Sequence, residues 1–295
     1  MKVLYRLFRI KQWVKNSFIF LPLIFSGNLF NTSYWLPTLI AFFSFSFTAS
    51  AVYCLNDIRD VDADRRHPQK RTRPIASGRI SVSAALCITF LLLFASAGLL
   101  FLLSPEAAVK VAIVQAVYLL LNIAYCFWLK RFPIIDVCII AFGFVLRLAD
   151  GAVATDIWLS PWIVCMTFLL TLFMAFAKRR DDVLLNLARK EEAPIREGTQ
   201  YYTTEYLNLV LGILAAVTLV CYLMYCISPD TMQRFHCDYI YVTFIFVLAA
   251  ILRYLMLAVV KGESGSPTDI ALHDRFIQLC VTAWIATFAL IIYAL

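Results

Sequence analysis

Apolar runs, each about as long as a lipid bilayer is thick, follow one another along this chain. Runs such as 88–103, 159–177 and 207–227 approach the roughly 20 residues that an α-helix needs to cross about 30 Å of hydrocarbon. Only short gaps separate the runs, which leaves no room for a soluble domain. The composition agrees, because 62% of the residues are hydrophobic and only 15% are charged, whereas soluble domains are usually about half apolar and about a quarter charged.

These runs predict an all-α fold, a polytopic membrane bundle of about nine transmembrane helices that forms one transmembrane domain over residues 1–295. The expected spans are 17–30, 35–56, 82–103, 107–127, 135–155, 159–177, 204–227, 239–260 and 276–295. The basic start of the chain leads into further spans without a small-residue cleavage site, so we expect no cleavable signal peptide. The nine cysteines contain no C-x-x-C pair, which favours helix packing over a metal or redox role.

The basic residues are distributed unevenly between alternate loops. All but three of the 26 Lys and Arg residues fall in the N-terminal segment or near the loops that follow the second, fourth, sixth and eighth expected spans. The exceptions are Lys110, Arg147 and Arg234. The positive-inside rule then places the N-terminus and the charged loops in the cytoplasm, with the protein in the inner (plasma) membrane. The net charge of +7 fits either attraction to anionic lipid headgroups or an anionic substrate.

The second expected span ends in a group of carboxylates that carries the main functional prediction. Asp57, Asp60 and Asp64 are spaced i, i+3 and i+7, so on a helix they share one face. Like charges at this spacing destabilise a helix unless a cation lies among them. Mg²⁺ prefers hard oxygen ligands and is usually held by one or two carboxylates together with substrate phosphate oxygens. We therefore predict that these aspartates are the catalytic residues, that they bind Mg²⁺ as the cofactor, and that the active site faces the cytoplasm.

A basic segment follows these carboxylates directly. Lys70 and Arg73 can pair with phosphate oxygens that a metal leaves exposed. Carboxylates and cations together at a bilayer face suit a diphosphate leaving group. A solvated loop with orienting charges is the alternative, but it does not explain aspartates that begin inside an apolar span. The lone loop histidine, His67, is expected to be a hydrogen-bonding or capping residue, and no general base is predicted.

The motif Asn56-Asp57-x-x-Asp60-x-x-x-Asp64, followed by Arg73-Pro74-x-x-x-Gly78, resembles the first signature of the UbiA superfamily of intramembrane prenyltransferases. The resemblance covers the whole chain in its length, expected helix count, expected orientation and charged loops. Within that superfamily, the chain is most similar to decaprenyl-phosphate phosphoribosyltransferases. The segments behind this closer match are 12–16, His67-Pro68-x-Lys70, Asp136, 144–151, 160–162 and 178–180.

The sequence departs from the wider superfamily after the sixth expected span. Most members that resemble aromatic prenyltransferases carry a second Asp-x-x-x-Asp motif there, which would bind a second Mg²⁺. This chain has Lys178-Arg179-Arg180-Asp181-Asp182 instead. Cations in place of carboxylates indicate that Lys178 and Arg179 bind phosphate directly, which suits a donor that carries a 5-phosphate as well as a diphosphate. A charge cluster at a helix end is the alternative, and the choice between one and two Mg²⁺ stays open.

Polar residues near the fifth span and the N-terminal segment add further candidates. Arg147 and Asp150 lie inside the fifth expected span, where ionisable residues usually face the bundle interior. They either pair with each other, or Arg147 binds a substrate phosphate. The resemblance implies that Lys15 and Asn16 line the site, although anchoring at the membrane interface suits them equally well. It also adds Asn56 to the predicted substrate-binding residues.

The resemblance implies transfer of a 5-phosphoribosyl group from phosphoribosyl pyrophosphate to a polyprenyl (decaprenyl) phosphate, with release of diphosphate. The expected partners are these two substrates and the membrane; nucleic acid is not expected, and a homo-oligomer is compatible with the sequence. One alternative moves a prenyl group from a prenyl diphosphate to an aromatic acceptor such as 4-hydroxybenzoate. A transporter or lipid-binding scaffold is less favoured, because such proteins place polar residues and broken helices near the membrane midplane.

Overall fold

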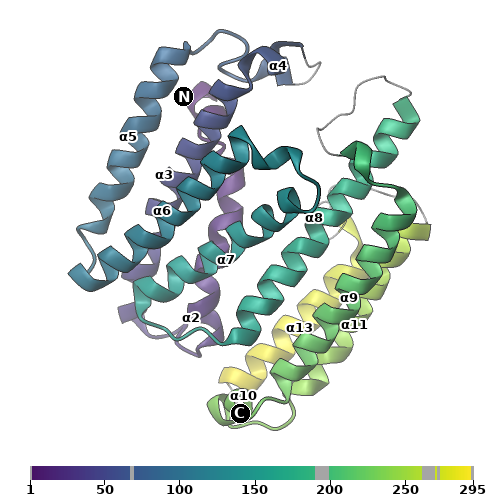
Figure 1. The fold of residues 1–295 in the computed structure, drawn as a ribbon. Helices are drawn as coiled ribbons and strands as arrows, with labels where there is room; N and C mark the ends of the chain where they lie inside the picture. Colours follow the sequence, from purple (N-terminus) through teal and green to yellow (C-terminus); the bar gives the residue numbers. More distant parts are fainter. Residues whose placement is uncertain (1, 67–69, 190–198, 261–269, 271–272, 294–295) are drawn as a thin grey trace. The chain divides into compact units, whose positions relative to one another are not determined.

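The protein is described here by a computed structural model that covers residues 2–66, 70–189, 199–260, 270 and 273–293. Within these ranges, seven helical segments are long and apolar enough to cross a membrane. They are α3 (Trp35–Arg59), α5 (Val82–Leu100), α6 (Pro105–Phe127), α7 (Ile135–Thr155), α8 (Pro161–Arg189), α9 (Thr204–Cys226) and the segment Ile240–Val260 that contains α11 (Phe244–Leu255) (Figure 1).

Shorter helices connect these segments. They are α1 (Lys2–Leu7), η1 (Ile10–Phe20), α2 (Leu21–Phe25), η2 (Thr32–Tyr34), α4 (Val61–Arg66), η3 (Lys70–Thr72), η4 (Leu129–Arg131), η5 (Thr199–Tyr201) and α10 (Pro229–Phe235). The segment Ile240–Val260 begins with η6 (Ile240–Thr243) and ends with the π-helix η7 (Met256–Val260). The last helix described is α13 (Arg275–Tyr293). Serine or threonine begins several of the long helices: the side chains of Ser81, Ser104 and Thr203 accept a hydrogen bond from a backbone N–H in the first turn of α5, α6 and α9. These caps satisfy donors that have no partner inside the helix.

The two ends of the chain differ from the expected pattern of spans. The first expected span, 17–30, is not one long helix, because η1 is a 3₁₀ helix and α2 has only five residues. Pro22 in the first turn of α2 lacks the N–H that a continuous helix would need, and Gly27 turns the chain with φ 79°. The last expected span corresponds to α13, whose apolar part, Arg275–Ile291, is shorter than a full span. The all-helical membrane fold is confirmed within the described ranges, and the count of nine spans stays a prediction.

Residue contacts divide the chain into two compact units. Unit 1 comprises Met1–Leu129 and Gly143–Leu159, and unit 2 comprises Lys130–Phe142 and Ser160–Leu295. The helix α7 contributes its first residues to unit 2 and the remainder to unit 1. A single transmembrane domain over residues 1–295 stays a prediction.

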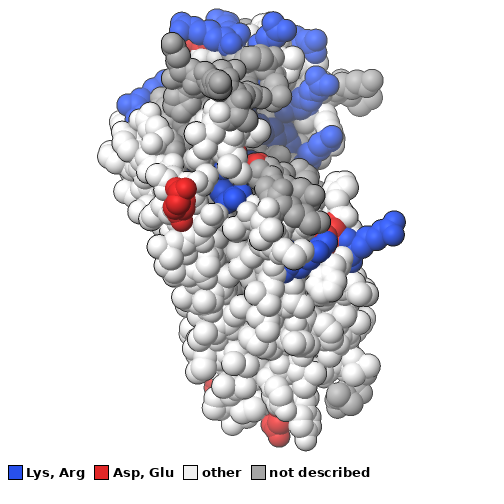
Figure 2. Space-filling model, turned by 90° about the vertical axis from the view of Figure 1, so that its right-hand side faces the viewer, with Lys and Arg blue, Asp and Glu red and all other residues white. Residues whose placement is uncertain are grey.

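Unit 1 is built around α3, which packs against α5, α6 and η1. The buried side of α3 carries mostly small side chains, namely Ala41, Ser44, Ser46, Thr48, Ala49, Ser50 and Ala51. Small residues let helices approach closely where lipid surrounds the bundle and water gives little driving force for association. Large apolar side chains such as Phe94 and Leu120 are exposed instead. Figure 2 shows broad areas of the described surface without charged side chains, as expected for helices that face lipid.

Unit 2 is a helical bundle in which α8 packs against α9, and α11 packs against both α9 and α13. Its core contains Phe173, Leu207, Leu211 and Tyr254. The basic end of α8, which carries the 178–180 segment, belongs to this unit. The predicted site residues are therefore distributed over both units.

Candidate functional site

The carboxylates predicted at the end of the second span lie where α3 gives way to α4. α3 ends at Arg59, Asp60 has φ −96° and ψ 10°, and α4 begins at Val61. The N–H groups of Asp60 and Asp64 donate to the carbonyl oxygens four residues earlier, at 3.0 and 2.8 Å. The aspartates are thus carried by two consecutive helices and not by one, while the helical repeat that places them on one side is largely kept.

Arg73 joins the two outer aspartates of this group. Its Nη1 lies 3.1 Å from Oδ1 of Asp57 and 2.6 Å from Oδ2 of Asp64. Asp57 and Asp64 are each only 3% exposed, so their charges are largely removed from water and need a compensating cation. Asp60, between them in sequence, is half-buried.

Arg9 is a second cation at Asp57, and no sequence motif singles it out. Its Nη2 donates to Oδ1 of Asp57, the oxygen that Arg73 also binds. The guanidinium group lies over the ring of Tyr53, 4.8 Å from the ring centroid, within the range of a cation–π contact. Because Asp57 is 48 positions away in the chain, only the docking of the N-terminal segment on α3 reveals this contact.

The loop after α4 is folded tightly enough to hold Arg73 in place. The N–H of Arg73 donates to the carbonyl oxygen of Lys70 at 2.9 Å, and Ile75 is buried with 1% exposure. Gly78 has φ 74°, a left-handed conformation that a residue without Cβ adopts readily. This explains the glycine in the 73–78 motif. The predicted residues His67 and Pro68 lie outside the described residues.

Each of the three guanidinium nitrogens of Arg147 donates a hydrogen bond to another protein group. It donates to Oδ1 of Asn16 at 2.8 Å, to the carbonyl oxygen of Gly143 at 2.7 Å and to the hydroxyl of Tyr118 at 3.2 Å. The group also lies over the rings of Phe45, Tyr118 and Phe144, with 4.9, 5.0 and 5.3 Å to the centroids. Asn16 in turn donates to Ser46 on α3 at 2.8 Å. Arg147 and Asn16, both predicted to bind substrate, therefore tie η1 to α7 and α3.

Asp150 belongs to a different polar network, and within the described residues it has no direct hydrogen bond or ion pair with Arg147. Oδ2 of Asp150 accepts a hydrogen bond from Nε2 of Gln115 at 3.3 Å. Oε1 of Gln115 accepts from the hydroxyls of Ser44, Thr48 and Ser96 at 3.0, 3.2 and 3.1 Å. These residues come from α3, α5, α6 and α7 and are all buried. Hydrogen bonds between helices of this kind hold membrane bundles together.

Asn56 and Lys15, which were also predicted to bind substrate, lie in unit 1. Oδ1 of Asn56 accepts a hydrogen bond from the Cys126 thiol at 3.3 Å, which connects the end of α3 to the end of α6. Lys15 in η1 is exposed.

In unit 2, Arg179 is enclosed by carboxylates. Its Nε and Nη2 lie 2.8 and 2.7 Å from Oδ2 of Asp136, and its Nη1 lies 3.2 Å from Oδ2 of Asp182. Arg179 is 1% exposed, whereas Lys178 is exposed. Nearby, the hydroxyl of Tyr202 accepts a hydrogen bond from the N–H of Ile134 at 2.6 Å, and burial raises the pKa of Tyr202 above its ordinary value. Of the two predicted phosphate ligands in this unit, Lys178 is the accessible one.

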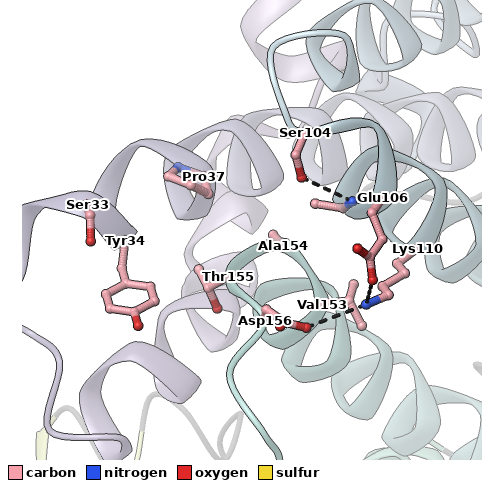
Figure 3. A pocket seen from close by; sticks show the side chains of 11 residues that line it. Ser33, Tyr34, Pro37, Ser104, Glu106, Lys110, Val153, Ala154, Thr155 and Asp156 are labelled. Atoms are coloured by element: carbon pink, nitrogen blue, oxygen red, sulfur yellow. Dashed lines mark hydrogen bonds and ion pairs between the residues drawn. The ribbon is translucent and has the colours of Figure 1, made fainter.

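A cavity in unit 1 lies at the far end of α3 from the aspartates. Its volume is about 350 Å³. It is lined by Ser33, Tyr34, Pro37, Ser104, Glu106, Ala107, Lys110 and residues 153–156. Figure 3 shows Lys110 between two carboxylates, 2.7 Å from Glu106 and 3.5 Å from Asp156. Because about 35 Å of helix separates Tyr34 from Asp57, this cavity is not part of the site at the aspartates.

The donors at the end of α3 suit a hard divalent cation. Within the described ranges, no three Asp, Glu, His or Cys side chains are grouped closely enough to hold a metal ion by themselves. Asp57 and Asp64 do supply two adjacent carboxylates, and Mg²⁺ commonly takes only one or two when substrate phosphates and water complete its octahedron. The guanidinium groups of Arg9 and Arg73 occupy these oxygens in the structure, as cations drawn to the same charge.

Comparisons with known proteins bear on the family and the fold. The sequence model of the UbiA prenyltransferase family matches residues 18–258. A decaprenyl-phosphate phosphoribosyltransferase from Mycolicibacterium smegmatis is 38% identical over 97% of this chain and 91% of its own length. A 4-hydroxybenzoate octaprenyltransferase from Francisella tularensis subsp. novicida is 32% identical over 45% of this chain and 48% of its own. A solved UbiA homolog from Archaeoglobus fulgidus, bound to DMAPP and Mg²⁺, shares the fold with a TM-score of 0.68 at 17% identity, covering 99% of each chain.

Proposed function

Because this chain belongs to the UbiA prenyltransferase family, we propose that it transfers a 5-phosphoribosyl group from phosphoribosyl pyrophosphate to a polyprenyl phosphate and releases diphosphate. The observation that carries this proposal is the similarity over 97% of the chain to a decaprenyl-phosphate phosphoribosyltransferase. The similarity to a 4-hydroxybenzoate octaprenyltransferase extends over less than half of the chain. The length of the lipid is left as a long-chain polyprenyl, with decaprenyl as the expected case.

In the proposed reaction, the bond between C1 of the ribose and the diphosphate oxygen breaks, and its electron pair leaves with the diphosphate. A phosphate oxygen of the lipid forms the new bond to C1. This oxygen is already anionic, so no side chain has to remove a proton from it. Asp57 and Asp64, with Asp60 beside them, would hold Mg²⁺, which when bound neutralises the charge that grows on the diphosphate.

The chain's own cations would bind and orient the phosphates. Arg73 is suited to this role, because its side chain is 27% exposed and already lies against Asp57 and Asp64. Lys70 belongs to the same loop, and we propose it as a second phosphate ligand. Of the pair in unit 2, we propose Lys178 as a direct phosphate ligand and Arg179 as the residue that fixes the end of α8 through Asp136.

The remaining predicted residues take supporting roles in this proposal. Asn16 and Arg147 bind each other, and we propose that they hold η1 in position so that the exposed Lys15 can reach substrate phosphate. Asn56 orients the end of α3 through its contact with Cys126. We further propose that the N-terminus and the charged loops face the cytoplasm and that the protein resides in the inner membrane, because the basic residues follow alternate spans.

The test is a reaction with purified protein in detergent, phosphoribosyl pyrophosphate labelled in the ribose, Mg²⁺ and decaprenyl phosphate. We expect label to enter the lipid phase and diphosphate to be released in equal amount. A parallel reaction supplies a polyprenyl diphosphate and 4-hydroxybenzoate. Label that stays in the aqueous phase, while the prenyl diphosphate is consumed in the parallel reaction, would replace the proposed function with aromatic prenyl transfer.

A further inference from the structure

The carboxylate of Asp57 is occupied by two arginines that differ in what else they hold. Arg73 binds Asp64 as well as Asp57, so it keeps a carboxylate partner if it leaves Asp57. Among the described residues, Arg9 has Asp57 as its one carboxylate partner, and its guanidinium also lies over the ring of Tyr53. Both guanidinium groups bind the same oxygen, Oδ1. A divalent cation that takes this oxygen therefore competes most directly with Arg9.

The backbone holds Arg9 at a defined place next to Asp57. Arg9 has φ 49° and ψ 48°, a left-handed conformation that L-residues other than glycine seldom adopt. It immediately precedes η1, a 3₁₀ helix of 11 residues, which is long for this type of helix. η1 is fixed to α3 by hydrogen bonds from Trp13 to Ser50 at 3.1 Å and from Asn16 to Ser46 at 2.8 Å. The position of the Arg9 backbone is thus set by η1, and only its side chain is left to change partner.

An arginine displaced from a carboxylate by a metal ion lies next to the charge that the metal brings with it. A diphosphate bound to that metal presents oxygens to a guanidinium, and arginine forms bidentate, charge-assisted hydrogen bonds with phosphate. The side chain of Arg9 is 25% exposed, so it can turn toward such a ligand without leaving a buried cavity behind.

We propose that Arg9 is a diphosphate-binding residue that exchanges partners: it neutralises Asp57 while the metal site is empty and binds the donor's diphosphate once Asp57 coordinates a divalent cation. The proposal rests on the part of the proposed function that assigns Asp57 to the metal. It adds a substrate-binding residue from the N-terminal segment, and it makes metal binding and diphosphate binding depend on each other through one side chain.

The test measures two affinities whose changes have opposite signs. Mn²⁺ replaces Mg²⁺ so that binding can be followed by electron paramagnetic resonance, and methylene diphosphonate serves as a diphosphate that cannot be cleaved. In Arg9→Gln, Mn²⁺ alone should bind several-fold more tightly, because its competitor at Asp57 is gone. Methylene diphosphonate should bind the Mn²⁺-loaded protein roughly tenfold more weakly, because a hydrogen bond to a charged group is lost.

Two further variants keep the result interpretable. Arg6→Gln removes the same charge from an exposed position on α1 and should leave both affinities near wild type. Arg9→Lys keeps the charge but lacks the planar fork, so we expect near wild-type Mn²⁺ affinity and weakened diphosphonate binding. A merely structural Arg9 would leave diphosphonate binding unchanged or would weaken both ligands together, and either result overturns the proposal. Neither readout uses phosphoribosyl pyrophosphate or lipid, so a failure of the proposed transfer reaction is seen separately.

Discussion

Replacing Gly151 by alanine tests the close approach between α7 and η1. A Cβ at this position would overlap the carbonyl oxygen of Ile19, and it would lie 2.8 Å from the carbonyl carbon and 3.1 Å from the Cα of Ile19. These are backbone atoms, so they cannot turn away as the end of a flexible side chain can. Gly151→Ala must therefore move η1 away from α7 or distort one of the two segments.

The magnitude follows from two opposing effects. Alanine is favoured over glycine in a helix interior by about 1 kcal/mol. Forcing an extra methyl group into a packed contact costs about 1–3 kcal/mol. Because the overlap is with backbone, we expect the upper end of that cost and a net loss of about 2 kcal/mol in the free energy of unfolding.

The assay is the midpoint of thermal unfolding in detergent, with two matched controls. Gly98→Ala in α5 and Gly212→Ala in α9 place a Cβ with no atom within 4 Å, so both should be neutral or stabilising by up to about 1 kcal/mol. Gly151→Ala should lower the midpoint and also lower transfer activity, because η1 carries Lys15. If Gly151→Ala behaves like the two controls, the described contact between η1 and α7 is incorrect.

Two further predictions concern buried and interfacial ion pairs. Asp136→Asn should lower the free energy of unfolding by about 3–5 kcal/mol, because it leaves the buried charge of Arg179 without its main carboxylate partner. Thermal unfolding in detergent measures this loss. A loss no larger than that of Lys178→Gln would contradict the prediction. Asp274 accepts hydrogen bonds from the guanidinium of Arg253 at 2.8 Å and from the N–H of Ile277 at 3.0 Å, and these contacts lower the pKa of Asp274 below its ordinary value. A carboxylate with a lowered pKa in the folded protein stabilises it above the unfolded pKa, about 4, and loses this contribution as the pH falls through the folded pKa. The difference in unfolding midpoint between wild type and Asp274→Asn should therefore be constant near neutral pH and shrink below about pH 4; a difference that persists at lower pH would argue against the pair.

The sequence predicted those features of the fold that depend on local composition. The long spans from α3 to α9 follow from apolar runs of sufficient length, since hydropathy alone decides which segments can lie in lipid. The first expected span is not one regular α-helix, because η1 is a 3₁₀ helix and Pro22 and Gly27 interrupt the apolar residues; hydropathy alone does not show this. Local periodicity also placed Asp57 and Asp64 on one side, even though the helix changes at Asp60.

The partners of the charged side chains could not be predicted in the same way. Arg9 meets Asp57 across 48 positions, and Arg179 meets Asp136 across 43. Which cation reaches which carboxylate depends on how distant helices pack, and a single sequence contains no direct record of that packing. For this reason Arg9 was not singled out, while Arg147 and Arg179 were predicted as substrate ligands although the structure surrounds both with protein groups.

The proposed transfer reaction requires a divalent cation held by the carboxylate of Asp57. The most direct measurement is the initial rate of label transfer from phosphoribosyl pyrophosphate to decaprenyl phosphate, as a function of Mg²⁺ concentration, for wild type, Asp57→Asn and Asp62→Asn. Asp62 is a matched control, because its side chain is 79% exposed on the neighbouring α4. We predict that wild type and Asp62→Asn depend on Mg²⁺ and stop in chelator, and that Asp57→Asn is inactive at every Mg²⁺ concentration while still folded. A folded Asp57→Asn variant with the wild-type rate, or a wild-type rate that persists in chelator, would mean that the reaction does not depend on a cation at Asp57.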